Sequence, residues 1–146
     1  MHMQASAIAD ETVAFTALIP GQSITSLGVG QTVVYENAIT NVGGAYHNKT
    51  GIFTAPGVYV FNVDTMLEPG NSQYLELVVD GHRITASYTH GAGETHYMTS
   101  SRTVTMRVGA GSEVWVRTVN HALHGDGIIH GNGFSSFSGW LLAFTE

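Results

Sequence analysis

Hydrophobic and polar residues alternate at every second position in several short stretches of this chain, and no stretch shows the periodicity of an amphipathic helix. Side chains two residues apart lie on the same face of a strand, so the alternation predicts β-strands with one buried face. Turn-forming pairs such as Gly43-Gly44 and Pro56-Gly57 separate the stretches. Many short strands joined by frequent turns predict an all-β sandwich or barrel.

Four stretches carry the alternation most clearly: residues 13–20, 73–80, 102–108 and 113–119. The first of them, for example, places Phe15, Ala17 and Ile19 on one face.

The stretch 137–144 differs because both of its faces are apolar, with Phe137 and Leu141 alternating with Trp140 and Leu142. Such a strand either lies in the middle of a sheet or contacts something beyond its own sandwich.

Aromatic residues recur within residues 35–61, at Tyr35, Tyr46, Phe53, Tyr59 and Phe61. Asn41 lies between the first two, and Gly57 begins the closing Gly-x-Tyr-x-Phe. This spacing resembles the signature of the C1q globular head domain, within the C1q and tumour-necrosis-factor superfamily. Residues 137–142, FSGWLL, resemble the closing strand of the same family.

The chain departs from the family pattern at three points. Tyr35 stands where the family usually has Phe, and Val63 replaces the last aromatic residue of the signature. The turn between Phe53 and Gly57 is also shorter than in most relatives.

The resemblance implies a jelly-roll β-sandwich of about ten antiparallel strands that assembles as a homotrimer, is secreted and catalyses nothing. It covers residues 11–146, and residues 1–10 form a tail whose first residues, Met1-His2-Met3, look like a cloning remnant. The secretion signal or collagen-like stalk that often precedes this domain in the family is not recognisable here.

Charged residues make up only 11% of the 146 residues, which indicates either apolar surface used in a subunit interface or a surface rich in Ser, Thr and Asn. The net charge is −6 and the four arginines are scattered, which argues against binding of nucleic acid.

No apolar run reaches the length of a membrane span, so no membrane insertion is expected. The absence of cysteine excludes disulfides and thiolate metal sites. Asn48-Lys49-Thr50 is an N-glycosylation sequon, whose use the sequence leaves open.

Short and long connections alternate along the chain. Short turns are expected at residues 55–57, 80–82 and 109–111, and long loops at 68–72, 89–95 and 121–133. Successive connections of an antiparallel sandwich fall at opposite ends, so the long loops share one end. Long loops on a rigid scaffold are where binding commonly occurs, and this end is the expected recognition face.

Five of the eight histidines fall in or beside two of these long loops: His90, His96, His121, His124 and His130. Together with Glu94 and Asp126, these imidazoles have the chemistry to ligate zinc or copper. Exposed histidines that only form hydrogen bonds are the alternative interpretation. Calcium is a second candidate ion, because relatives bind it near the trimer apex, although the sequence has no acidic cluster like that of an EF-hand.

The leading hypothesis is a lectin-like or pattern-recognition trimer, whose relatives recognise polysaccharide, lipopolysaccharide or sialylated glycans. Aromatic platforms and planar hydrogen-bonding groups suit sugars. The candidate ligand-binding residues are Tyr88, His90, His96, Tyr97, Arg102, His121, His124 and Asn132.

The alternative function is a structural or signalling trimer head that engages a protein receptor in grooves between subunits. The sequence has no nucleophile elbow, paired-carboxylate motif or phosphate-binding loop, so an enzyme is not expected.

Overall fold

The structure, a computed structural model, describes residues 12–25, 27–119 and 127–144. These residues form ten strands and no helix, and therefore include no helix long and apolar enough to cross a membrane. The strands are β1 (Ala14–Leu18), β2 (Asn37–Val42), β3 (Tyr46–His47), β4 (Ile52–Phe53), β5 (Gly57–Leu67), β6 (Gln73–Val79), β7 (His82–Thr89), β8 (Met98–Val108), β9 (Val114–Thr118) and β10 (Ser136–Ala143).

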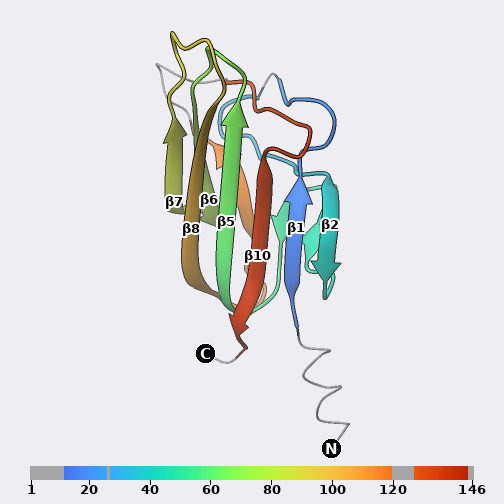
Figure 1. The fold of residues 1–146 in the computed structure, drawn as a ribbon. Helices are drawn as coiled ribbons and strands as arrows, with labels where there is room; N and C mark the ends of the chain where they lie inside the picture. Colours follow the sequence, from blue (N-terminus) through green and yellow to red (C-terminus); the bar gives the residue numbers. More distant parts are fainter. Residues whose placement is uncertain (1–11, 26, 120–126, 145–146) are drawn as a thin grey trace, which may run out of the picture.

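The strands form two five-stranded antiparallel sheets that pack face to face (Figure 1). The front sheet has the order β2-β1-β10-β5-β8, and the back sheet has the order β3-β4-β9-β6-β7. The last strand, β10, thus lies between β1 and β5, which are far from it in sequence. This is the jelly-roll sandwich expected from the sequence, with the expected number of strands.

Aromatic rings fill the space between the two sheets. The ring of Phe15 stacks on Tyr46 at a centroid distance of 4.8 Å and meets the edge of Phe137 at 4.9 Å. Phe53 meets Phe61 edge-on at 5.3 Å. Such pairs add roughly 0.5–1.5 kcal/mol each beyond the area that they bury. The aromatic signature of the sequence therefore forms the core.

Gly139 of β10 lies against this core and has no room for a side chain. A Cβ atom there would lie 2.7 Å from Cδ1 of Phe61 and 2.8 Å from Cε1 of Phe15. Glycine is required at this position because the two rings occupy the volume of a side chain.

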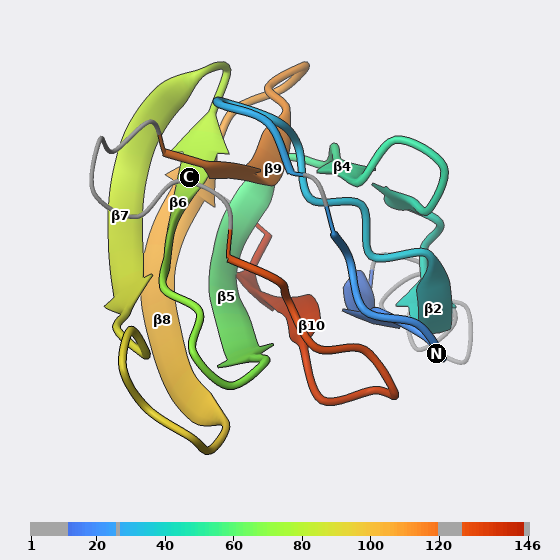
Figure 2. The same ribbon diagram turned by 90° about the horizontal axis from the view of Figure 1, so that it is seen from above.

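The long connections meet at one end of the sandwich, which we call the loop end (Figures 1 and 2). The amide of Glu68, in the β5–β6 loop, donates to the carbonyl of Ile128, in the β9–β10 loop, at 3.0 Å. The β7–β8 loop lies there too, as expected. The connection from β1 to β2, residues 19–36, also reaches this end, where Ile24 pairs with Ile129. The first and last described residues lie at the opposite end.

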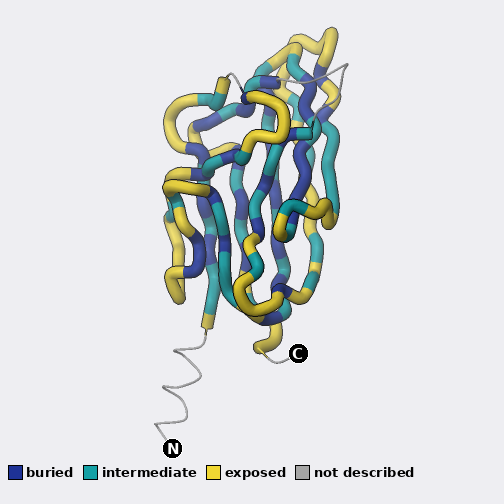
Figure 3. Tube along the Cα trace, turned by 180° about the vertical axis from the view of Figure 1, so that it is seen from behind, coloured by how far each residue is buried: buried dark blue, intermediate teal, exposed yellow. Residues whose placement is uncertain are grey.

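The outer face of the front sheet carries exposed apolar side chains. Trp140 and Leu142 of β10 point away from the core and are 44% and 59% exposed (Figure 3 shows burial along the chain). The structure thus places β10 in the middle of its sheet, and its second face is apolar and exposed among the described residues.

Candidate functional site at the loop end

A pair of stacked tyrosines lies where β6 and β7 reach the loop end. Tyr74 and Tyr88 are directly opposite each other in the β6–β7 ladder, and their rings lie 4.3 Å apart. The hydroxyl of Tyr88 is 2.8 Å from Nδ1 of His90. The Oγ of Ser72 accepts hydrogen bonds from the amides of the β7–β8 loop, which holds His90 beside the rings. We call Ser72, Tyr74, Tyr88 and His90 the tyrosine cluster.

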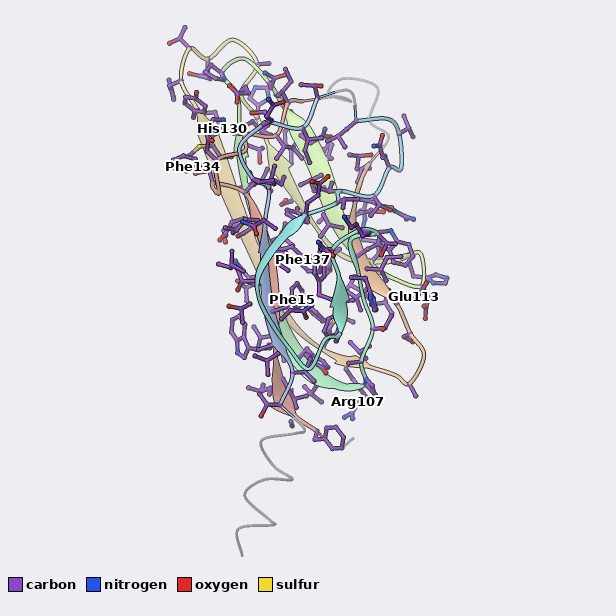
Figure 4. The ribbon with its side chains drawn as sticks, turned by 90° about the vertical axis from the view of Figure 1, so that its right-hand side faces the viewer. Phe15, Arg107, Glu113, His130, Phe134 and Phe137 are labelled. Carbon is purple, nitrogen blue, oxygen red and sulfur yellow. The ribbon has the colours of Figure 1, made fainter. Side chains whose placement is uncertain are left out.

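A second group of side chains lies beside the front sheet at the same end. Nδ1 of His130 contacts Oε2 of Glu68 at 2.5 Å, and the hydroxyl of Ser23 donates to the same oxygen at 2.7 Å. The His130 ring lies 4.7 Å from the ring of Tyr97 and 5.2 Å from that of Phe134 (Figure 4). We call Ser23, Glu68, Tyr97, His130 and Phe134 the histidine cluster.

The histidine cluster joins all four connections of the loop end. Ser23 comes from the β1–β2 connection, Glu68 from the β5–β6 loop, Tyr97 from the β7–β8 loop, and His130 and Phe134 from the β9–β10 loop. The hydrogen bonds from Ser23 and then His130 hold the pKa of Glu68 below its usual range, because they stabilise the ionised carboxylate. Because that carboxylate accepts from Nδ1, the neutral His130 ring has its acceptor at Nε2.

Ser23, His130 and Glu68 do not form a catalytic triad, although their residue types match one. In a triad the serine donates to the imidazole, and the carboxylate holds the other ring nitrogen. Here Ser23 donates to Glu68, and its Oγ is 3.4 Å from the same nitrogen, Nδ1, that faces the carboxylate. The serine is therefore not activated by the histidine in this arrangement.

The rings at the loop end remain accessible. Tyr97 and Phe134 are 46% and 55% exposed. A pocket of about 450 Å³ opens beside the histidine cluster, and Ser23, a member of the cluster, is one of the residues that line it. Its apolar wall includes Ile19 and Leu27, and its polar wall includes Gln31 and Glu36. This combination of apolar surface and hydrogen-bonding groups suits a small polar ligand with apolar faces.

The structure brings together only some of the candidate ligand-binding residues. Tyr88 and His90 lie in the tyrosine cluster, and Tyr97 lies in the histidine cluster. Nε2 of His96 lies 3.8 Å from Oε1 of Glu94, and both side chains are well exposed in the β7–β8 loop. His121, His124 and Asp126 are outside the described residues.

The contacts of Arg102 and Asn132 are with backbone carbonyl groups. Arg102 is the fifth residue of β8, and its Nε donates to the carbonyl of Ala86 on β7 at 3.0 Å. This bond links the edge strands of the two sheets. Asn132 has a φ of 55° and its amide donates to the carbonyl of Pro20, so it forms a tight turn.

Sequence reasoning missed Ser23 and Phe134. Ser23 lies in the β1–β2 connection, which was not counted among the long loops, and its partners Glu68 and His130 are 45 and 107 residues away. No local pattern signals such contacts. Phe134 follows Gly131-Asn132-Gly133, and a large aromatic residue beside a glycine-rich turn is a signal that could have identified it.

The described residues contain no group of three or more His, Asp or Glu side chains able to hold a metal ion. Of the side chains in the described ranges, Glu94 forms an ion pair with His96, and the carboxylate of Glu68 is engaged by Ser23 and His130. These carboxylates do not form the set of six to eight oxygen ligands that calcium requires.

The fold and the arrangement of its loops define a jelly-roll domain whose long connections meet at one end. The model of the C1q domain matches residues 14–142, and this chain belongs to the C1q domain family. It is 35% identical over 120 residues to complement C1q tumor necrosis factor-related protein 3 of Mus musculus, and 34% identical to that of Homo sapiens. Each match covers 78% of this chain and 46% of the relative, so the chain spans about half the length of these curated relatives.

Solved structures share the fold at low sequence identity. The globular domain of zebrafish complement 1qA protein superposes with a TM-score of 0.70 at 17% identity, covering 92% of this chain and 100% of that one. The Eiger TNF structure from S. frugiperda gives 0.69 at 14% identity, covering 92% and 95%. The C1q and tumour-necrosis-factor fold expected from the aromatic spacing is thus confirmed.

Proposed function

We propose that this chain is a secreted recognition module that assembles as a homotrimer and binds glycans of microbial or host surfaces at its loop end. The observation that carries the proposal is the pair of clusters there. Both place aromatic rings beside hydrogen-bonding groups, and neither contributes to the aromatic core.

Sugars present apolar C–H faces together with hydroxyl groups, so proteins bind them with aromatic rings and polar side chains. Tyr97 and Phe134 offer half-exposed rings, and His90 and His130 add imidazoles at fixed positions. Polysaccharide, lipopolysaccharide and sialylated glycans share this chemistry, and all three remain within the proposal.

The proposed homotrimer uses the outer face of the front sheet. Trp140 is paired in register with Ala14 on one side and Val60 on the other, which forms an apolar row across three strands. Exposed apolar surface of this kind is typical of a subunit interface. Because the first and last described residues lie at the opposite end, a chain attached there leaves the loop end facing away from it.

The test is a screen of glycans and bacterial polysaccharides with the wild type and two double variants. Tyr88→Ala with His90→Ala removes the tyrosine cluster, and Tyr97→Ala with Phe134→Ala removes the exposed rings of the histidine cluster. The matched control is Ile84→Ala, because Ile84 is also a half-exposed apolar residue but lies on β7 away from the loop end. We expect sugar-competable binding that at least one double variant loses and the control keeps.

A flat glycan screen together with tight binding to one protein would contradict the glycan proposal. That outcome favours the alternative, a signalling or structural head that binds a protein receptor. Equal binding by the wild type and both double variants would move the site away from the loop end.

A further inference from the structure

The sequon Asn48-Lys49-Thr50 occupies the turn that connects β3 to β4. The carbonyl of His47 closes this turn by accepting from the amides of Thr50 at 3.2 Å and Gly51 at 2.8 Å. Gly51 has a φ of +79°, and a Cβ atom there would lie 2.9 Å from the carbonyl oxygen of Val33. Backbone hydrogen bonds and the conformation of Gly51 therefore stabilise the turn, in addition to any contribution from the side chains of the sequon.

The side chain of Asn48 is held in an accessible position. Its Nδ2 donates to the carbonyl of Glu36 at 3.0 Å, while Lys49 and Thr50 are exposed. Nδ2 carries two hydrogens and this bond uses one of them. The other hydrogen is available for substitution without loss of the bond to Glu36.

We propose that Asn48 is an N-glycosylation site. The reaction uses an oligosaccharide linked to a lipid pyrophosphate, the donor of the eukaryotic secretory pathway. A bond forms between Nδ2 and C1 of the first sugar, the bond from C1 to the pyrophosphate oxygen breaks, and the lipid pyrophosphate leaves with the proton that Nδ2 loses. This inference rests on the secretion part of the proposed function but not on its ligand.

The surface around Asn48 has room for the glycan. An open groove of about 640 Å³ lies beside the turn and is lined by the sequon together with Ile52, Thr54 and Glu113. Glu113 projects from the side of the sandwich, well below His130 at the loop end (Figure 4). The first sugars fit against this groove, and the tyrosine and histidine clusters stay uncovered.

The position of the site gives the glycan a physical role. β3 is an edge strand of the back sheet, with β4 on one side only. Exposed strand edges invite pairing with other chains, and a bulky hydrated group beside one blocks that approach. Only 11% of the residues are charged, and a glycan adds hydrated polar surface beside this edge.

The experiment is expression with an added secretion signal in animal cells, followed by intact mass measurement before and after peptide N-glycosidase. We expect the wild type and Thr50→Ser, which keeps the sequon, to carry one enzyme-removable glycan. Asn48→Gln and Thr50→Ala should carry none, because the chain has no other Asn-X-Ser/Thr sequence. Thr50→Ala keeps the bond from Asn48 to Glu36 but removes the contacts of the Thr50 hydroxyl with His47 and Ile52, so the melting temperatures of both variants are measured to separate glycan loss from loss of folding.

A positive control is the double variant Gln4→Asn with Asn48→Gln, which moves the sequon to Asn-Ala-Ser near the N-terminus. If this control is glycosylated and the wild type is not, the inference is wrong and Asn48 is rejected as an acceptor. A glycosylated wild type that binds no sugar would retain the inference while contradicting the glycan proposal.

Discussion

The core and the loop end both contain aromatic side chains, but they use them differently. In the core, the rings of Phe15 and Phe137 contact other rings and are 2% and 0% exposed. At the loop end, Tyr97 and Phe134 contact the imidazole of His130 and are about half exposed (Figure 4).

We expect this difference to separate stability from the proposed recognition. A sealed ring contributes the free energy of its burial, and its removal leaves a cavity. A half-exposed ring contributes less to folding and keeps a face available for a ligand. Substitutions in the two regions should therefore have opposite effects: loss of folding in the core, and loss of binding with folding retained at the loop end.

Phe61→Ala should have the largest effect on folding. Its ring is fully buried and meets those of Phe53 and Phe137. Removing it should lower the free energy of unfolding by about 3–5 kcal/mol, enough to unfold a marginal domain. Thermal or urea unfolding checks this, and an unchanged melting temperature would show that the core is not organised around these rings.

Trp140→Asp should prevent assembly while leaving the subunit folded. Trp140 is 44% exposed within the chain, so its loss costs the subunit little, but a carboxylate buried in a subunit interface costs several kcal/mol. Light scattering should give a trimer for the wild type and a monomer near 15.5 kDa for the variant. Val29→Asp is the control, since Val29 is 68% exposed and lies outside the front sheet. A trimeric Trp140→Asp variant would place the interface elsewhere.

Glu76→Gln should have a moderate, pH-dependent effect. Burial raises the pKa of Glu76, but the hydrogen bonds from Arg83 and Arg117, each at 2.6 Å, outweigh burial and lower it. A lowered folded-state pKa stabilises the fold above the unfolded value of about 4.3, and this stabilisation is lost as the pH falls through the folded value.

The free energy of unfolding of Glu76→Gln, measured by urea denaturation, should therefore be lower than that of the wild type by roughly 1–3 kcal/mol at pH 7. At pH 3 the difference from the wild type should be much smaller. Glu113→Gln, at an exposed carboxylate of the same sheet region, is the control and should change the midpoint little. A wild type and variant that differ equally at both pH values would contradict the role assigned to the two arginines.

The core could be predicted from the sequence because it follows from the spacing of residues that are close together in the sequence. Period-two spacing places Tyr59, Phe61 and Val63 on one face, and all three are buried. The alternation of short and long connections likewise predicted which loops meet. Neither inference needs a contact between distant residues.

The histidine cluster could not be predicted, because its contacts join residues far apart. Glu68 and His130 are 62 residues apart, and the register between their loops follows from the packing of whole strands. The start of β8 was also not predictable: the alternating pattern began at Arg102, whereas β8 begins at Met98, so Arg102 is the fifth residue of the strand.

Removing the loop-end rings should have the smallest effect on folding. In the triple variant Tyr88→Ala, Tyr97→Ala and Phe134→Ala, no substituted ring belongs to the sealed core. The free energy of unfolding should fall by about 1 kcal/mol or less per site. A collapse in stability comparable to that of Phe61→Ala would show that these rings serve folding.

The affinity of this triple variant for the glycan selected by the screen, measured beside its melting temperature and assembly mass, tests the central claim most directly. We predict that affinity falls at least tenfold, or about 1.4 kcal/mol, while the trimer mass is unchanged and the subunit remains folded at the assay temperature. Wild-type affinity in a folded triple variant would contradict the assignment of recognition to the loop end.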